Sequence, residues 1–309
     1  MMLFKPKFWD KKIGLFSTLL FPFSLITIFI VFLKKKLINK YTFKTPVICI
    51  GNIYIGGTGK TPASILFANE IAKLHRKPVI IRKYYKSHYD EHELIKNNFK
   101  DFILSKNRFE AIKKVDKSEF DVVILDDGLQ DYKIKKNLSI VCFNENQLIG
   151  NGLVLPSGPL RENLSALKDV EVVLINGKKN KSFEEKIYNI NRNLKIFYSY
   201  YKPLNLEDFK SKKLFALAGI GNPNNFFRII EENNLEIEKK FIFPDHYKFS
   251  KSEIQNIIQE AESKNAEIIM TEKDYFKIRD FNLKKLNFLK VSLKIQNKEE
   301  LIGIIEKSI

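Results

Sequence analysis

The sequence contains little cysteine and histidine, and this scarcity excludes several classes of site. Only two cysteines and four histidines occur among 309 residues. Cys49 and Cys142 lie inside apolar runs typical of strands, so we interpret them as buried thiols in a reducing compartment rather than as a disulfide or a metal pair. No group of Cys and His has the spacing of a zinc site, so zinc is not indicated.

Arginine is also scarce, supplying seven of the 53 basic residues although the formal net charge is +17. That charge suits an anionic membrane surface, an anionic substrate or nucleic acid, and a plain lysine-biased composition explains it equally well. The lysines are spread along the chain, and no arginine cluster alternates with aromatic residues, so we expect no nucleic-acid partner. No obligate protein partner is indicated. With 44% hydrophobic and 29% charged residues, wholesale disorder is excluded.

Charged residues are absent from one long stretch, residues 13–33, which has lysines on both sides. As a helix it is long enough to cross a hydrocarbon core of about 30 Å. A cleaved signal peptide fits less well because lysines, not small residues, follow the stretch, and a buried core helix fits less well because no polar face exists. Pro22 would kink a straight helix, and the lysines give no inside-outside bias. We expect residues 1–40 to anchor the chain to membrane lipids, and whether the helix spans or dips stays open.

From residue 46 onward, apolar runs alternate with helical stretches, which indicates a parallel sheet covered on both faces. The expected strands are residues 46–50, 78–81, 101–104, 121–125, 138–143, 170–175, 214–218, 266–270 and 286–293. The expected helices are residues 60–75, 224–232 and 250–263. Polar stretches at 176–186 and 201–213 suggest a boundary, giving a larger domain over residues 41–205 and a smaller α/β domain over 206–309. The last helix is free to return to the first domain.

A strand, a glycine-rich loop and a helix follow one another around residues 47–75, which is the context of a phosphate-binding loop. Glycines let the backbone curl so that its N–H groups point at phosphate oxygens. Lys60 would supply charge to the β- and γ-phosphates, Thr61 could ligate Mg²⁺, and the helix N-terminus adds its dipole. The expected nucleotide-binding residues are Gly56, Gly57, Thr58, Gly59, Lys60 and Thr61.

The loop departs from the commonest pattern because Tyr54 occupies the place of the first glycine. Gly56 and Gly57 resemble instead the Gly-Gly-x-Gly-Lys-Thr variant of MinD-type and plasmid-partition ATPases, although Ile55 stands where those proteins have a second lysine. The expected fold class is α/β: a P-loop (RecA/MinD-like) parallel sheet with helices on both faces, a second smaller α/β domain and an N-terminal membrane helix.

Asp126 and Asp127 follow the apolar run 121–125 directly. An ATP site of this type needs an acid at the end of a neighbouring strand to hold magnesium. Because adjacent strand residues point to opposite faces, one of the two would serve the metal and the other a structural role. The sequence leaves open which is which.

Several separate motifs occur in a fixed order along nearly the whole chain. They are Gly51-Asn52 with residues 56–62 (GGTGKTP), then 126–130 (DDGLQ), 150–152 (GNG), 155–162 (LPSGPLRE), 218–223 (AGIGNP), 243–246 (FPDH) and 271–274 (TEKD). Together they resemble the tetraacyldisaccharide 4′-kinase family, the lipid A 4′-kinases of Gram-negative bacteria. The resemblance implies transfer of the ATP γ-phosphate to the 4′-hydroxyl of tetraacyldisaccharide 1-phosphate, an anionic glycolipid, at the cytoplasmic face of the bacterial inner membrane. It also implies that the smaller domain closes over the ATP-binding domain.

The resemblance also assigns an acid and a histidine that work together to the positions of Asp90 and His246. Glu91 follows that acid, and Gln130, Arg161 and Glu162 belong to matching motifs that we place near the substrate cleft. For Glu272 and Asp274 the motif supports only a position near the cleft.

Two departures from the family pattern stand out. Asp131 occurs where the family usually has histidine, and residues 82–86 replace an Arg-Gly-Tyr-Gly stretch.

The expected mechanism uses Asp90, His246, Lys60 and Asp127 as catalytic residues. Lys60, Thr61 and Mg²⁺ would neutralise the phosphates, with Asp126 or Asp127 holding the metal. Asp90 would accept the hydroxyl proton, while His246 orients it or relays the proton. Two rivals stay open: a membrane-associated ATPase switch of the MinD/partition type, which needs no acceptor, and a non-enzymatic nucleotide-binding anchor, which would leave the acids idle.

Overall fold

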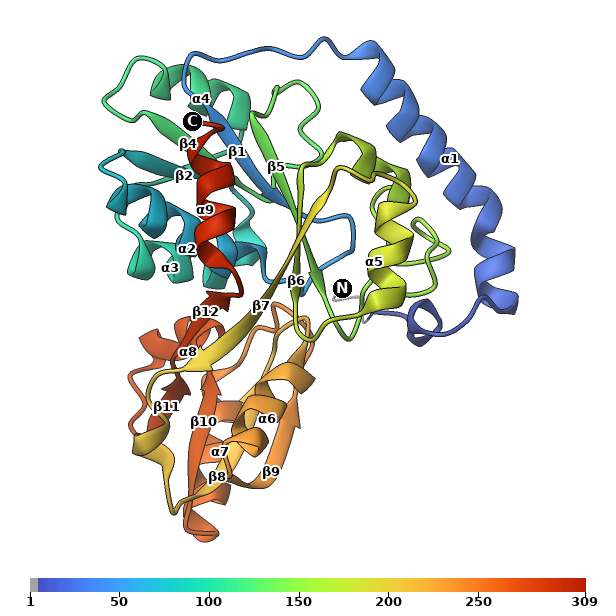
Figure 1. The fold of residues 1–309 in the computed structure, drawn as a ribbon. Coiled ribbons are helices and arrows are strands. Elements are labelled where there is room, and N and C mark those ends of the chain that lie inside the picture. The colour runs from blue at the N-terminus through green and yellow to red at the C-terminus, as the bar shows by residue number, and fades with distance from the viewer. Residues whose placement is uncertain (1–4) are drawn as a thin grey trace. The chain divides into compact units, whose positions relative to one another are not determined.

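The computed structural model describes residues 5–309, which divide into two compact units (Figure 1). The larger unit consists of Lys5–Tyr84, Phe99–Tyr200 and Lys294–Ile309. The smaller unit consists of Tyr85–Asn98 and Tyr201–Leu293. Each unit therefore contains segments that are far apart in the sequence.

The larger unit is built on an eight-stranded sheet in the order β12-β7-β6-β5-β1-β4-β2-β3. Its strands are β1 (Val47–Gly51), β2 (Pro78–Lys83), β3 (Phe102–Ser105), β4 (Val122–Asp126), β5 (Leu138–Asn144), β6 (Val172–Asn176), β7 (Lys195–Pro203) and β12 (Val291–Ile295). From β3 to β7 all neighbouring strands pair in parallel. Every residue of β1, β4, β5 and β6 is buried, which explains why these strands read as unbroken apolar runs.

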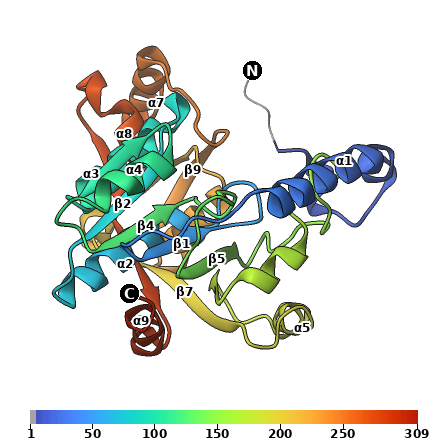
Figure 2. The same cartoon turned by 90° about the horizontal axis from the view of Figure 1, so that it is seen from above.

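Helices cover both faces of this sheet. They are α2 (Lys60–Lys73), α4 (Arg108–Val115), α5 (Lys181–Tyr188) and α9 (Lys298–Glu306), with 3₁₀ turns η1 (Lys7–Asp10) and η3 (Leu164–Asp169). Figure 2 shows α4 and α9 on opposite faces of the sheet. Asn107 and Asn180 cap α4 and α5 by accepting hydrogen bonds from backbone N–H groups of the first turn. The fold class expected from the sequence is confirmed.

The apolar stretch forms helix α1 (Leu15–Leu37), which continues through Pro22. Among residues 5–309, α1 is the one helix that is long and apolar enough to cross a membrane by length and composition. Its only buried residues are Ser17 and Ser24, whereas large apolar side chains such as Phe23 are exposed. The helix therefore has a narrow polar contact face and a broad apolar exposed face.

The smaller unit contains a four-stranded parallel sheet in the order β11-β10-β8-β9. Its strands are β8 (Lys213–Ala218), β9 (Glu236–Ile242), β10 (Ala266–Thr271) and β11 (Leu286–Leu289). Its helices are α3 (Tyr89–Asn98), α6 (Pro223–Glu232), α7 (Lys251–Ser263) and α8 (Glu272–Ile278), with 3₁₀ turns η2 (Lys86–His88), η4 (Leu206–Phe209) and η5 (Arg279–Phe281). Helix α3 packs against α8, which brings a segment from residues 85–98 beside residues 272–278.

Sequence-based expectations for the strands were wrong or incomplete at three places, one of which is β7, a strand that was not expected. Residues 286–293 were expected as one strand, but they form β11 and β12, which break at Lys290 and belong to different sheets. Strand β9 was missed because most of its residues are exposed on the sheet edge, so no apolar run marks it.

Candidate active site

The glycine-rich loop adopts the backbone conformation that phosphate binding requires. Gly56, Gly57 and Gly59 have φ angles of 74°, 49° and 85°, which side-chain-bearing residues rarely adopt. Gly59 is the N-cap of α2, so Lys60 and Thr61 occupy the first turn of a helix that leaves the carboxyl end of β1. Such a curled backbone at a helix N-terminus directs N–H groups toward an anion.

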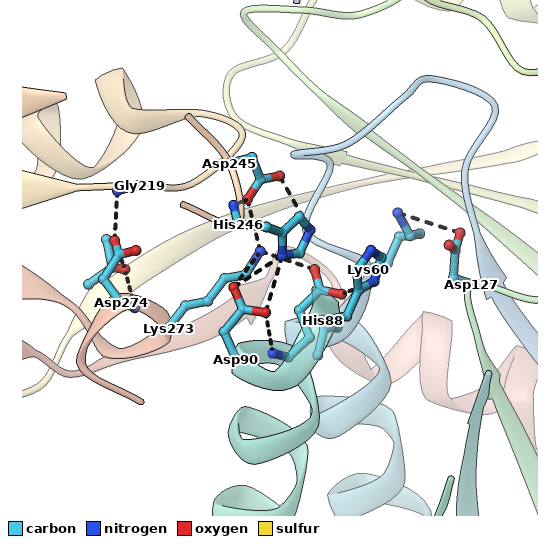
Figure 3. Close-up of polar contacts among 12 residues, drawn as sticks. Lys60, His88, Asp90, Asp127, Gly219, Asp245, His246, Lys273 and Asp274 are labelled. Atoms are coloured by element: carbon cyan, nitrogen blue, oxygen red, sulfur yellow. Dashed lines mark hydrogen bonds and ion pairs between the residues drawn. The ribbon is translucent and has the colours of Figure 1, made fainter. Parts of the chain in front are cut away.

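Lys60 points at the carboxylate of Asp127 (Figure 3). The same carboxylate also binds Arg161. The Lys60 Nζ–Asp127 Oδ1 distance is 3.5 Å, and the Arg161 Nη1–Asp127 Oδ1 distance is 2.8 Å. Burial by itself would raise the pKa of Asp127, but Lys60 and Arg161 outweigh it and hold that pKa well below its usual range. Burial lowers the pKa of Lys60, an effect that Asp127 opposes. Asp127 is therefore an anion between two cations.

Asp126 has a different environment, although it is the adjacent residue. It is fully buried at the end of β4 and accepts hydrogen bonds from the hydroxyls of Thr61 and Ser64, each at 3.1 Å. The guanidinium of Arg82, from the end of β2, pairs with the same carboxylate and also donates to the Thr61 hydroxyl at 3.1 Å. Thr61 and Asp126 thus present two hard oxygen ligands side by side, a set that fits Mg²⁺.

The two neighbouring acids face different partners because β4 ends at Asp126 and the backbone turns at Asp127. Asp126 faces the phosphate-loop threonine, and Asp127, at φ 59° in the left-handed region, faces the lysine. The sequence could not separate these roles, and nothing in it marked Arg82 as the partner of Asp126.

Hydrogen bonds of Gln130 join the phosphate loop to Glu162, which follows the Pro-Ser-Gly-Pro segment of residues 156–159. Gln130 Nε2 donates to Glu162 Oε1 at 2.8 Å and to the carbonyl of Asn52 at 3.1 Å. Asn52 in turn donates to Thr58 at 3.1 Å, within the loop itself. Gln130 Oε1 also accepts from Arg161 at 3.4 Å. Four residues expected near the cleft or the nucleotide thus share one hydrogen-bond network.

Asp131, the residue that replaces the usual histidine of the family, pairs with Arg108. Their Nη1–Oδ2 distance is 2.8 Å, and the same guanidinium donates to the backbone carbonyls of Asp126 and Asp127 at 3.0 Å and 2.8 Å. Asp131 therefore neutralises an arginine that supports the two-acid segment.

Asp90 and His246 form a second cluster, in the smaller unit (Figure 3). His246 Nδ1 lies 3.2 Å from both carboxylate oxygens of Asp90, across 156 residues of sequence. Asp90 is 2% exposed at the start of α3, and His246 adopts the left-handed region at φ 58°. An ionised carboxylate only accepts hydrogen bonds, so Nδ1 donates to Asp90, while Nε2 lies 3.9 Å from Asp245 Oδ2.

Two lysines of α8 flank Asp90, with Lys273 Nζ and Lys277 Nζ each 3.6 Å from Oδ2. Burial alone would raise the pKa of Asp90, but Lys273, His246 and Lys277 outweigh it and hold the pKa well below its usual range. Burial likewise lowers the pKa of Lys273, but Asp245 and Asp90 outweigh it and raise that pKa. Asp90 is therefore held as a carboxylate. Lys273 and Lys277 were missed from the sequence because lysine is common throughout the chain.

His88 and Glu91 complete this cluster. The His88 ring stacks on His246 with centroids 4.2 Å apart and an interplanar angle of 8°. His88 Nδ1 lies 3.3 Å from Glu91 Oε2, and Lys273 Nζ lies 3.2 Å from Glu91 Oε1. The imidazole of His246 is thus held on one face by a ring and at one edge by a carboxylate.

Asp274 has a structural role at the start of α8. It accepts from the backbone N–H of Gly219 at 2.9 Å and from the Thr271 hydroxyl at 2.7 Å, and Lys277 pairs with it at 2.7 Å. Thr271 caps α8 by accepting from the N–H of Asp274 at 3.1 Å. This TEKD motif therefore sets the start of the helix that carries both lysines.

The predicted site residues thus fall into two groups. Lys60, Thr61, Asp126 and Asp127 meet in the larger unit, together with Gln130, Arg161 and Glu162. Asp90, Glu91 and His246 meet in the smaller unit.

Known proteins are similar to this sequence along nearly its whole length. The family model for Tetraacyldisaccharide-1-P 4′-kinase matches residues 16–309. The tetraacyldisaccharide 4′-kinase of Pelagibacter ubique (strain HTCC1062) is 42% identical over 312 residues, covering 99% of this chain and 98% of the relative. The protein of the same name from Rickettsia canadensis (strain McKiel) is 34% identical and covers 94% of this chain and 93% of its own length.

The fold has a solved counterpart. The crystal structure of the "apo" form of LpxK from Aquifex aeolicus in complex with ATP has a TM-score of 0.73 and 20% sequence identity, and covers 95% of this chain and 99% of that chain. This likeness confirms the fold expected for the resemblance. Because the family model and close relatives extend over almost every residue, the chain belongs to the tetraacyldisaccharide 4′-kinase (LpxK) family of lipid A biosynthesis.

Proposed function

We propose that this protein transfers the ATP γ-phosphate to the 4′-hydroxyl of tetraacyldisaccharide 1-phosphate. Family membership supports the reaction, and one observation carries the assignment to residues: a phosphate loop beside two differently partnered acids, with a separate buried carboxylate–imidazole pair. A nucleotide-binding half and a proton-handling half are what a phosphoryl transfer to a hydroxyl needs. An ATPase switch has no acceptor hydroxyl, so it does not require the carboxylate–imidazole pair.

In the nucleotide-binding half, the N–H groups of Gly56, Gly57, Thr58 and Gly59 and the Lys60 ammonium bind the triphosphate. Arg161 and Lys60 both contact Asp127 Oδ1, so Arg161 is close enough to Lys60 to add a second cation for the phosphates. Lys60 exchanges part of its contact with Asp127 for phosphate oxygens.

For the metal we propose Thr61 and Asp126, whose oxygens lie 3.1 Å apart. Asp127 then serves as the counter-anion that orients Lys60 and Arg161 rather than as the principal ligand. When bound, Mg²⁺ supplies neutralisation of charge on the β- and γ-phosphate oxygens. Arg82 pairs with Asp126 and balances the charge of this buried carboxylate.

In the proton-handling half, Asp90 accepts the hydrogen bond of the acceptor hydroxyl and His246 orients Asp90 or relays its proton. The low pKa of Asp90 suits a loose transition state, because the carboxylate then aligns the hydroxyl and takes its proton late. His88 and Glu91 hold the imidazole of His246 in place.

Asp90→Asn and His246→Ala test this half. Each is expected to lower kcat by about 10²–10⁴-fold, because general-base action of a positioned group contributes that much. Formation of the 4′-phosphorylated lipid from labelled ATP and the disaccharide 1-phosphate is measured in detergent. Asp208→Asn, which changes an exposed acid of the same unit, is the control and should keep wild-type turnover. Full activity of Asp90→Asn would contradict the assignment.

The same assay separates the kinase from the ATPase switch. Wild-type protein that releases inorganic phosphate from ATP but never phosphorylates the disaccharide would favour the switch. Wild-type protein with no affinity for ATP in the presence of magnesium would overturn the proposed function as a whole.

We also propose that α1 holds the protein at the cytoplasmic face of the inner membrane. Leu15, Phe23 and Phe32 are 72%, 58% and 56% exposed, so apolar surface extends from the first turn of the helix to the last. Ser17 and Ser24 on the other side are buried against the protein. Because these serines hydrogen-bond to Asn151, Val154 and Ser157, we propose a helix that lies along the membrane surface rather than one that spans it.

A further inference from the structure

Helix α1 is tied to the larger unit by polar contacts at both of its ends and in its middle. Near its start, Ser17 Oγ accepts from Asn151 Nδ2 at 3.1 Å. In its middle, Ser24 Oγ donates to the carbonyl of Val154 at 2.7 Å and accepts from the N–H of Ser157 at 3.1 Å. In its last turn, Lys35 Nζ lies 2.7 Å from Glu162 Oε2. The contact face thus follows one side of the helix over its length.

The Lys35–Glu162 pair differs from an ordinary surface ion pair. The Glu162 side chain is 2% exposed, whereas the Lys35 side chain is 33% exposed. Lys35 also lies over the Tyr132 ring, with its Nζ 5.3 Å from the centroid. A buried carboxylate without its counter-charge is strongly unfavourable, so the charge of Glu162 depends on a residue that the apolar helix supplies.

From Glu162, polar contacts continue to the phosphate loop. Gln130 Nε2 donates a hydrogen bond to Glu162 Oε1 at 2.8 Å and another to the Asn52 carbonyl at 3.1 Å. Gln130 also contacts Arg161 at 3.4 Å, and Arg161 binds Asp127 at 2.8 Å, the carboxylate that Lys60 faces. Every group in this series belongs to the larger unit.

We propose that Lys35 is a positioning residue for the nucleotide site: by neutralising buried Glu162, the docked membrane helix holds Gln130 and Arg161 in the arrangement that presents Lys60 and Asp127 to ATP. The inference rests on the proposed ATP-binding function and adds to it a residue outside the family motifs described above. It makes the apolar helix part of the catalytic architecture as well as an anchor. A chain whose helix has lost this contact binds ATP less well.

Lys35→Met tests the proposal, because methionine keeps an unbranched apolar side chain close to the size of the lysine stem and removes the charge. The expected result is an increase of about tenfold in KM for ATP and in the dissociation constant of a fluorescent ATP analogue, with a smaller change in kcat. Lys35→Arg should restore near-wild-type values. Lys34→Met removes a charge from the same helical turn without touching Glu162 and should behave as wild type.

Two further measurements separate coupling from anchorage and from misfolding. Flotation with vesicles of phosphatidylethanolamine and phosphatidylglycerol should recover Lys35→Met and Lys34→Met equally, since both keep the apolar face of α1. The double variant Lys35→Met/Glu162→Gln removes both charges, so its thermal stability should recover from that of Lys35→Met, while its KM for ATP stays raised because Gln130 has lost its anionic partner.

The outcomes are distinguishable. Equal affinity for ATP in Lys35→Met and Lys34→Met, with the wild type binding ATP, overturns the coupling and leaves the proposed function intact. Failure of Lys35→Arg to restore ATP affinity also overturns it. Absence of ATP binding by the wild type overturns the proposed function and the coupling with it.

Discussion

At the residue scale, the two groups of site residues both use a non-glycine residue in the left-handed backbone region. Asp127 and His246 have φ angles of 59° and 58°. This conformation costs an ordinary residue about 1–2 kcal/mol, so it persists only where surrounding contacts impose it. Around Asp127 those contacts come from Lys60 and Arg161, and around His246 they come from Asp90 and the stacked His88 ring.

Lys273 sets the protonation of Asp90, and its removal should change the pH dependence of the reaction. The pKa of Asp90 is depressed, so the carboxylate stays ionised well into the acid range. In Lys273→Met that pKa rises because a cation that lowers it is removed, and the acid limb of kcat/KM against pH should move to higher pH. Lys251→Met, an exposed lysine of the same unit, should leave the profile unchanged.

The same shift has a consequence for stability. A carboxylate with a depressed folded-state pKa stabilises the fold above the ordinary pKa of aspartate, and this contribution is lost as pH falls toward the folded value. Lys273→Met should therefore lose less stability on acidification than the wild type, which thermal unfolding at a series of pH values measures. An unchanged acid limb together with an unchanged stability profile would contradict the role of Lys273.

At the element scale, the strand–loop–helix unit β1–α2 depends on its glycines more than on its side chains. Gly59 caps α2 at φ 85°, a conformation in which a Cβ is strained whatever space surrounds it. The position therefore couples helix initiation to the direction of the backbone N–H groups that face the phosphates.

Gly59→Ala should destabilise the protein by about 1–2 kcal/mol and weaken ATP binding, because it strains the turn that aims those N–H groups. Gly303→Ala is the matched control. Gly303 lies inside α9 with nothing within 4 Å of an added Cβ, so alanine should stabilise that helix by about 0.5–1 kcal/mol. Chemical denaturation and titration with an ATP analogue measure both effects. Wild-type ATP affinity in Gly59→Ala would contradict the assignment of the loop.

At the scale of the whole molecule, the chain combines a large parallel sheet, a small parallel sheet and an apolar helix docked on the larger unit through Ser17, Ser24 and Lys35. A helix held at its start, middle and end by the same folded unit cannot insert across a bilayer without breaking those contacts. Breaking them would leave buried Glu162 without its counter-charge.

We therefore expect both ends of α1 to remain on the cytoplasmic side. In cells carrying Lys12→Cys or Lys40→Cys, a membrane-impermeant maleimide should label neither residue from outside the inner membrane and both in inverted vesicles. The native Cys49 and Cys142 are 0% and 1% exposed, so they contribute little background. Labelling of Lys12→Cys from the outside with Lys40→Cys protected would show a spanning helix instead.

The sequence by itself determined the features whose chemistry is contiguous along the chain. A strand, three glycines and Lys60-Thr61 predict a phosphate loop because backbone curl and helix start are local properties. The unbroken apolar runs predict buried parallel strands, and residues without charge predict the apolar helix α1. Asp90 and His246 were reached through motif resemblance, since no local pattern links residues 156 positions apart.

Only the tertiary structure decided which partners those residues meet. It separates Asp126, facing Thr61 and Arg82, from Asp127, facing Lys60 and Arg161, and it selects Lys35, Lys273 and Lys277 from a chain rich in lysine. The physical reason is that an ion pair depends on the distance between side chains and on the solvent removed around them, and both are set by packing. The sequence does not distinguish a lysine in solvent from a lysine beside a buried carboxylate, and only the fold separates these two environments.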